Sequence, residues 1–226
     1  MTLPTPQYTA VAIAAVFALL GMLTLAGGAW RRPGLWLCAL AGAAAGFFAR
    51  EAVKLVVDLV SPVDALATGA GGAAVNVVVA SAVGELLKAL GPLALVTLAP
   101  ADSRTALAYG AAAGAGFGFV VARQGVALAL GLLGSPFITP VSMVAAIAGW
   151  FFRILPHVAT TAYVARAAVR GGLGVALPAA MVFQGALGFA DRLPVVAGVP
   201  LGLSVAAAAA VAAVLALRAR EGGEGA

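Results

Sequence analysis

Two ionisable residues lie three positions apart inside a long apolar run, in the stretch Gly84-Glu85-Leu86-Leu87-Lys88. A charge near the middle of a bilayer costs between about 3 and more than 10 kcal/mol unless it finds a partner or a water-filled cavity, so such a residue is a candidate for function. The spacing of three places Glu85 and Lys88 on one face of a helix. A glutamate in a low-dielectric cavity can act as a general base. We therefore expect Glu85 to be the centre of the chain's chemistry.

Three later apolar runs also carry polar groups at intermediate depth, namely Arg123 with Gln124, then His157, then Gln184. At 1.5 Å per residue, Glu85 lies about 18 Å, Arg123 about 15 Å and His157 roughly 25 Å from the outer ends of their runs. The similar depths of Glu85 and Arg123 predict a buried ion pair between them. Two interpretations of the whole set stay open: a water-accessible cavity in which Glu85 and His157 act together, or mutually neutralised groups that hold the helices together.

The elements that must position these residues are membrane helices. Of the 226 residues, 63% are hydrophobic and only 9% are charged, with a mean hydropathy of +1.10, far from the composition of a soluble domain. The runs are continuous in Ala, Val, Leu and Gly, and each is long enough to cross about 30 Å of hydrocarbon. The sequence predicts an all-α, polytopic transmembrane bundle that forms one domain over residues 1–226.

We expect seven spans, at about 8–29, 35–60, 73–99, 105–133, 140–168, 173–193 and 195–217. Arginines gather at alternate ends of these runs, and positively charged loops stay cytoplasmic, which predicts an outer N-terminus and an inner C-terminus. Glycines spaced by four, at Gly110, Gly114 and Gly118, allow close helix packing. Residues 218–226 are charged and rich in glycine, which predicts a disordered cytoplasmic tail. The charges Arg50, Glu51, Lys54 and Asp58 are spaced for ion pairs at the end of the second span.

Several functional classes are excluded by the same composition. The basic residues are dispersed and end hydrophobic runs, so they indicate topology and no nucleic-acid partner. One histidine, one cysteine and a lone intramembrane glutamate do not supply three credible metal ligands. The sequence also has no phosphate-binding loop and no Gly-x-Ser-x-Gly elbow. We therefore expect no metal or other cofactor, and an integral membrane protein whose surroundings are lipid.

The order of three motifs resembles that of the PrsW-type membrane proteases, relatives of the CAAX prenyl endopeptidases within the glutamate-dependent intramembrane proteases. The motifs are GELLKALGP (84–92), AYGAAAGAGFGFVVARQ (108–124) and PHVATTAYVA (156–165), and the similar core covers about residues 73–190. The resemblance implies a peptidase in which Glu85 activates water and His157 stabilises the oxyanion. It implies a transmembrane helix as substrate or partner, and a prokaryotic plasma membrane as location.

The chain departs from that family's pattern at three positions. Gly84 stands where the family has the first of two glutamates, Arg123-Gln124 stand in place of Glu-Asn, and Gln184 stands where a second histidine is expected. Lys88 matches the family's basic residue. Three hypotheses follow: an active protease, a catalytically impaired relative that binds a transmembrane helix, and a transporter of ions or small molecules. The substitutions favour the second, and no internal repeat supports the third.

Overall fold

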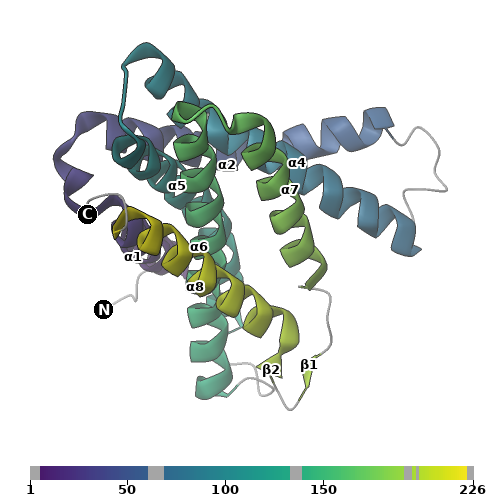
Figure 1. The fold of residues 1–226 in the computed structure, drawn as a ribbon. Coiled ribbons are helices and arrows are strands. Elements are labelled where there is room, and N and C mark those ends of the chain that lie inside the picture. The colour runs from purple at the N-terminus through teal and green to yellow at the C-terminus, as the bar shows by residue number, and fades with distance from the viewer. Residues whose placement is uncertain (1–5, 61–68, 133–138, 191–194, 197–198, 223–226) are drawn as a thin grey trace.

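The computed structural model describes residues 6–60, 69–132, 139–190, 195–196 and 199–222, and within these the chain is almost entirely helical (Figure 1). Its elements are α1 (Pro6–Ala26), a 3-10 turn η1 (Gly27–Arg31), α2 (Pro33–Val60), α4 (Gly69–Leu98), α5 (Ser103–Gly131), α6 (Pro140–Val169), α7 (Leu173–Ala190), β1 (Val195–Val196), β2 (Val199–Pro200) and α8 (Leu201–Gly222). The predicted all-α bundle is confirmed, and each predicted span has a helix at its place.

Five helices of the described chain are long and apolar enough to cross a membrane: α1 with η1, α4, α5, α6 and α7. The protein is therefore an integral membrane protein. The helices α2 and α8 are not among these five, so the number of crossings stays a prediction. The expected seventh span begins too early, because 195–200 includes the antiparallel strands β1 and β2. The predicted disorder is wrong for 218–222, where α8 continues to Gly222, while 223–226 lie outside the described residues.

The centre of the bundle is α5, which packs against α1, α2 and α6 and is buried along most of its length. Twelve of its eighteen buried residues are Ala or Gly, so neighbouring backbones come close. A Cβ added at Gly110 would overlap the carbonyl of Thr161, and one added at Gly114 would overlap the carbonyl of His157. This confirms the packing predicted from the glycine spacing and holds the His157 segment of α6 tightly against α5.

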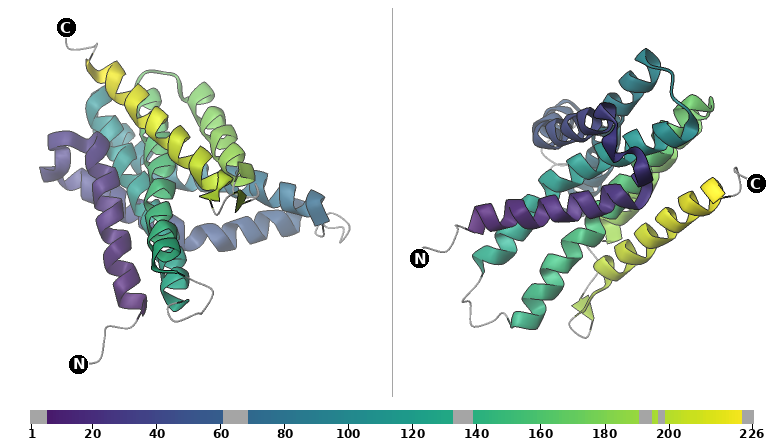
Figure 2. Two further views of the ribbon diagram at one scale, coloured as in Figure 1. Left: turned by 90° about the horizontal axis from the view of Figure 1, so that it is seen from below. Right: turned by 90° about the vertical axis from the view of Figure 1, so that its left-hand side faces the viewer.

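The C-terminal part of α2 and the N-terminal part of α4 lie side by side and project away from α5 and α6, as Figures 1 and 2 show. The four charged residues of α2, Arg50, Glu51, Lys54 and Asp58, are exposed. They form no ion pair with one another, so the predicted cluster is wrong, whereas Lys88 and Glu85 of α4 do form an ion pair. Exposed i,i+3 and i,i+4 pairs are worth so little that long side chains need not hold them.

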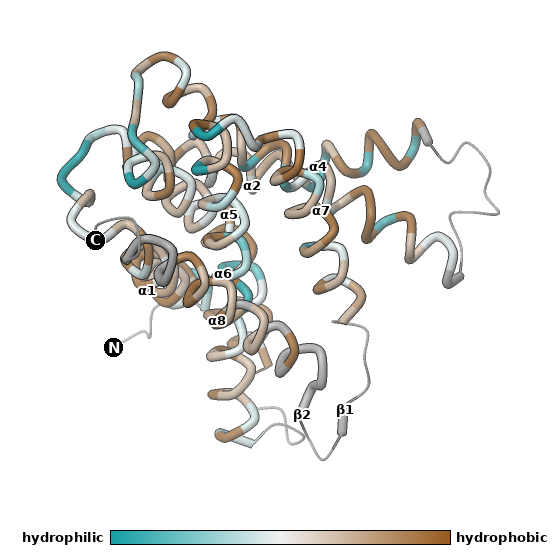
Figure 3. Tube along the Cα trace, in the orientation of Figure 1, coloured by the Kyte–Doolittle hydropathy of each residue, from teal (hydrophilic) through white to brown (hydrophobic). Residues whose placement is uncertain are grey.

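Hydrophobic residues run along most of the helices, as the brown stretches of Figure 3 show, and many of the large ones are exposed. Leu55, Leu90, Leu98, Val141 and Val175 are each more than 60% exposed. A soluble monomer rarely exposes so many large apolar groups together, whereas a lipid-facing surface requires them. A set of buried polar residues lies where α4 meets α6, and it includes Glu85, Lys88, Thr160 and Thr161.

Candidate functional site

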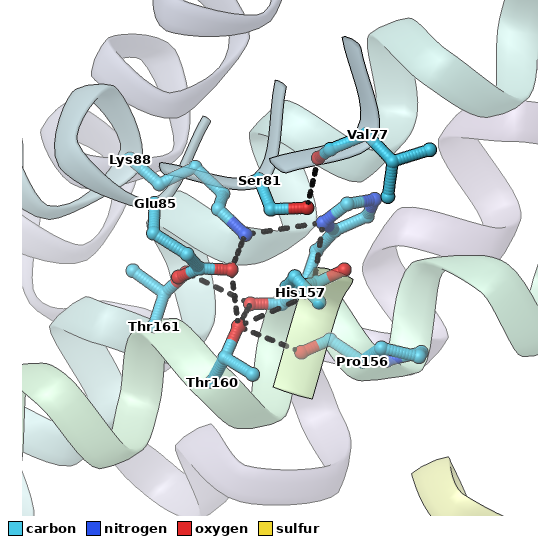
Figure 4. A network of polar contacts seen from close by, with 9 residues as sticks. Val77, Ser81, Glu85, Lys88, Pro156, His157, Thr160 and Thr161 are labelled. Atoms are coloured by element: carbon cyan, nitrogen blue, oxygen red, sulfur yellow. Dashed lines mark hydrogen bonds and ion pairs between the residues drawn. The ribbon is translucent and has the colours of Figure 1, made fainter. Parts of the chain in front are cut away.

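Three helices bring Glu85, Lys88, His157 and Gln184 into one cluster. Glu85 and Lys88 come from the middle of α4 and are each only 1% exposed, and Lys88 Nζ lies 2.5 Å from Glu85 Oε1. The same Nζ lies 3.1 Å from His157 Nδ1 of α6, as Figure 4 shows. Gln184 Nε2 of α7 lies 3.3 Å from that ring nitrogen. Lys88 therefore bridges the carboxylate and the imidazole.

Thr160 closes the cluster from α6, one turn after His157. Its Oγ1 lies 3.0 Å from Glu85 Oε1 and 2.9 Å from the Pro156 carbonyl oxygen. A hydroxyl has one proton, so Thr160 can donate to only one of these two acceptors at a time. Glu85 Oε1 thus has up to two donors, whereas its buried Oε2 has no hydrogen-bond partner among the described residues. Oε2 is therefore the carboxylate oxygen whose acceptor capacity is unused among the described residues.

The contacts of His157 define its tautomer. Lys88 in its ammonium form has only donors, so His157 Nδ1 accepts from it. A neutral imidazole that accepts at Nδ1 carries its proton on Nε2. The ring also packs at 5.1 Å, centroid to centroid, from Phe117 of α5. His157 is therefore held by Phe117 on one side and by Lys88 and Gln184 at Nδ1, and it presents Nε2–H as a donor.

The cluster lines a cavity of about 430 Å³ between α2, α4, α5, α6 and α7. Its polar wall is Glu85, Lys88, His157, Gln184 and Ser81, with Arg50 of α2 beside them. Gly84 also lines it, and a Cβ there would meet only Phe117 Cζ, at 3.7 Å. Gly84 therefore leaves open space at a position where the resemblance to the PrsW-type proteases would place a second carboxylate. A cavity of this size can hold several waters, whose share of liquid volume is about 30 Å³ each.

The predicted ion pair between Glu85 and Arg123 is wrong. The guanidinium of Arg123 lies over the ring of Phe47 at 5.6 Å and lines a different cavity with Gln124, Gln7 and Ala127. The reason is rotation about the helix axis. Phe117 and Val121 of α5 face the cavity, and Arg123, at about 100° per residue, points about 200° away from Val121. Equal depth in the membrane does not put two side chains on facing surfaces.

The structure brings together four of the six predicted site residues, Glu85, Lys88, His157 and Gln184, and places Arg123 and Gln124 at a different cavity. The sequence prediction omits Thr160, although the spacing of three from His157 indicated a shared face. It also omits Phe117 and Arg50, whose apolar or interfacial positions gave no sign of the cavity. Among the described residues, no group of three His, Cys, Asp or Glu side chains could hold a metal ion.

Chemically, the arrangement offers one carboxylate oxygen without a partner beside an ammonium, an amide and an imidazole N–H. An acceptor aimed at a water can remove its proton, and donors around the same cavity can stabilise negative charge on a substrate oxygen. Comparison with protein-family models, with curated proteins and with solved structures finds no match. The similarity to PrsW-type proteases therefore stays a hypothesis.

Proposed function

We propose that this protein is a glutamate-dependent intramembrane peptidase of the PrsW and CAAX-protease kind, acting on a transmembrane segment in a prokaryotic plasma membrane. One observation carries the proposal: Glu85 and His157 line the same cavity, while Arg123 lies elsewhere. The guanidinium of Arg123, if paired with Glu85, would have filled the site and held its carboxylate. Its absence from the cavity leaves space for a water and a peptide carbonyl.

The reaction follows from the positions of the donors and acceptors. A water donates to Glu85 Oε2 and loses that proton as its oxygen bonds to the scissile carbonyl carbon. The carbonyl oxygen becomes an oxyanion, which Lys88 Nζ, Gln184 Nε2 and His157 Nε2 are placed to stabilise. The C–N bond then breaks, and Glu85 returns the proton to the leaving amine. Glu85 thus acts first as base and then as acid, and ends in its starting state.

The test compares membrane fractions of cells that produce the wild-type chain, Glu85→Gln, or Glu51→Gln, with new peptide termini mapped by mass spectrometry. We expect termini within apolar segments that depend on Glu85 and persist in Glu51→Gln, because Glu51 is an exposed glutamate outside the cavity. Identical sets of termini from wild type and Glu85→Gln at equal protein levels would refute the peptidase.

A second candidate is a non-catalytic protein that binds a transmembrane helix. The observation in its favour is the ion pair itself, because Lys88 Nζ at 2.5 Å already engages Glu85 Oε1, and Gly84 supplies no second carboxylate. This candidate predicts that the same membrane proteins copurify with wild type and with Glu85→Gln, without Glu85-dependent cleavage. The terminus mapping and a parallel pull-down therefore separate the two functions.

A further inference from the structure

Two further cavities lie between α6, α7 and α8, apart from the cavity that Glu85 lines. The first, of about 280 Å³, is lined by Ala159, Thr160, Tyr163, Ala179, Ala180, Phe183, Ala213, Ala216 and Leu217. The second, of about 230 Å³, is lined by Tyr163, Arg166, Ala167, Arg170, Gly172, Val175 and Leu217. Tyr163 and Leu217 line both, so the two cavities adjoin each other at these residues, and together they are called here the α6–α8 groove.

The two halves of the α6–α8 groove have opposite chemistry. The half near Thr160 is walled by alanines and aromatic side chains. The other half contains two arginines near the end of α6, Arg166, which is 5% exposed, and Arg170, the C-cap residue of α6. Arg170 Nε donates to Ser103 Oγ at 2.9 Å, which places its guanidinium beside the start of α5. Such a groove is complementary to a molecule with an apolar chain and an anionic head.

The length of the groove matches one leaflet of a bilayer. The ten residues from Thr160 to Arg170 rise about 15 Å along α6, which is half of the roughly 30 Å hydrocarbon thickness. The arginines therefore reach the level of the head groups when the alanine half lies among acyl chains. The predicted topology places them on the cytoplasmic side, where anionic lipids attract basic residues.

We propose that the α6–α8 groove is a binding site for an anionic phospholipid, with the phosphate at Arg166 and Arg170 and one acyl chain along Ala159, Ala180 and Ala216. Small side chains on three helices make the apolar half narrow, which fits a single hydrocarbon chain. The groove reaches Thr160, whose hydroxyl lies 3.0 Å from Glu85 Oε1. A bound lipid thus touches the wall that separates the groove from the cavity of Glu85. The proposal does not depend on the peptidase activity.

The test is native mass spectrometry of the delipidated full chain, titrated with phosphatidylglycerol and with phosphatidylcholine that carry the same acyl chains. We expect the wild type to bind phosphatidylglycerol more tightly. In R166Q/R170Q, that affinity falls by about 30-fold, because each basic residue near an anionic head group contributes roughly fivefold. Arg104→Gln is the matched control, since it removes an exposed arginine near the same helix ends without lining either cavity.

Two further variants keep the test decisive if R166Q/R170Q does not fold. Arg170→Gln alters only the exposed arginine and should lower the phosphatidylglycerol affinity about fivefold. Ala216→Phe adds bulk from an exposed position and should weaken binding of both lipids. Equal affinity for the two lipids in the wild type, or wild-type binding by Arg170→Gln and Ala216→Phe, would overturn the proposal. A copurified peptide bound in the α6–α8 groove in place of lipid would also overturn the proposal.

Discussion

At the scale of single residues, Lys88 determines the state of the site because it is the counter-ion of Glu85 and the donor to His157. Its burial has an energetic consequence. Removing one member of a buried pair leaves the other charge uncompensated, which typically costs about 3 to 5 kcal/mol, whereas replacing both members is often nearly neutral. Replacing one member of the Glu85–Lys88 pair should therefore destabilise the protein more than replacing both members.

We predict that Lys88→Met lowers the free energy of unfolding in mixed micelles by about 3 to 5 kcal/mol, and that adding Glu85→Gln restores most of the loss. The matched control is Glu51 with Lys54, which has the same residue types and the same spacing but is exposed on α2. The corresponding substitutions there should change the stability by less than about 0.5 kcal/mol. Additive effects of Lys88→Met and Glu85→Gln would show that the two side chains do not interact.

A second residue-scale prediction concerns Asp102, the N-cap of α5 in the connection outside the membrane-spanning segments. Its Oδ1 accepts from the Thr105 backbone N–H at 2.6 Å, and this hydrogen bond, with help from Arg32 and Arg104, holds the pKa of Asp102 below its ordinary value. A lowered pKa means that the stabilisation is present at neutral pH. This stabilisation is lost as the pH falls from about 4, the ordinary pKa of an aspartate, through the lower pKa that Asp102 has in the folded protein.

We therefore predict that Asp102→Ala lowers stability at pH 7 by about 1 kcal/mol, as N-cap removal usually does. Asp102→Asn keeps a capping oxygen and should retain most of this stability while losing the part that varies with pH in acid. Unfolding curves of the three proteins at pH 7 and at pH 3.5 measure both effects. If Asp102→Asn lost as much stability between pH 7 and pH 3.5 as the wild type, other carboxylates would be responsible for that loss.

At the scale of elements, the close contact of α5 with α6 is what fixes His157. Gly114 lies against the His157 carbonyl, and even a methyl group would overlap it. The helices would have to separate, which moves the imidazole relative to Lys88. Gly131, near the end of the same helix, has no atom within 4 Å of an added Cβ.

We predict that Gly114→Ala destabilises the protein by about 1 to 3 kcal/mol, as overpacking does, and reduces any Glu85-dependent cleavage. Gly131→Ala should leave the stability unchanged or raise it by up to about 1 kcal/mol, because alanine favours a helix. Thermal unfolding in detergent measures both. Equal effects of the two substitutions would mean that helix propensity, and not the α5–α6 contact, determines the cost.

The extent of sequence-based prediction differs between elements and sites for a physical reason. Hydrophobic runs must match the bilayer thickness, so the helices could be located from the sequence to within a few residues for most spans. Glu85 and Lys88 could be paired because an i,i+3 spacing is a local property of one helix. Arg123 could not be placed, since its direction depends on how α5 rotates against α2 and α4. The contribution of Thr160 depends on the approach of α6, which is a tertiary property.

At the scale of the whole molecule, the positions of the arginines distinguish between two membrane topologies, one with seven crossings and one with five. If α2 and α8 cross together with the five long apolar helices, Arg31, Arg104, Arg166 and Arg170 all lie on one side. If neither crosses, α4 starts from the side of Arg31, and Arg104 emerges on the opposite side. The positive-inside rule favours seven crossings.

We predict that a cysteine in place of Asp58, at the end of α2, reacts with a membrane-impermeant maleimide in intact cells. One in place of Ala101, between α4 and α5, should react only after permeabilisation. Both are placed in a Cys38→Ala background, although Cys38 itself is fully buried. The reverse labelling pattern would contradict the predicted threading, because it arises if α2 does not cross the membrane or if the whole chain is inverted. It would also place Arg166 and Arg170 at the outer leaflet, and the anionic lipid of the α6–α8 groove would then have to come from that side.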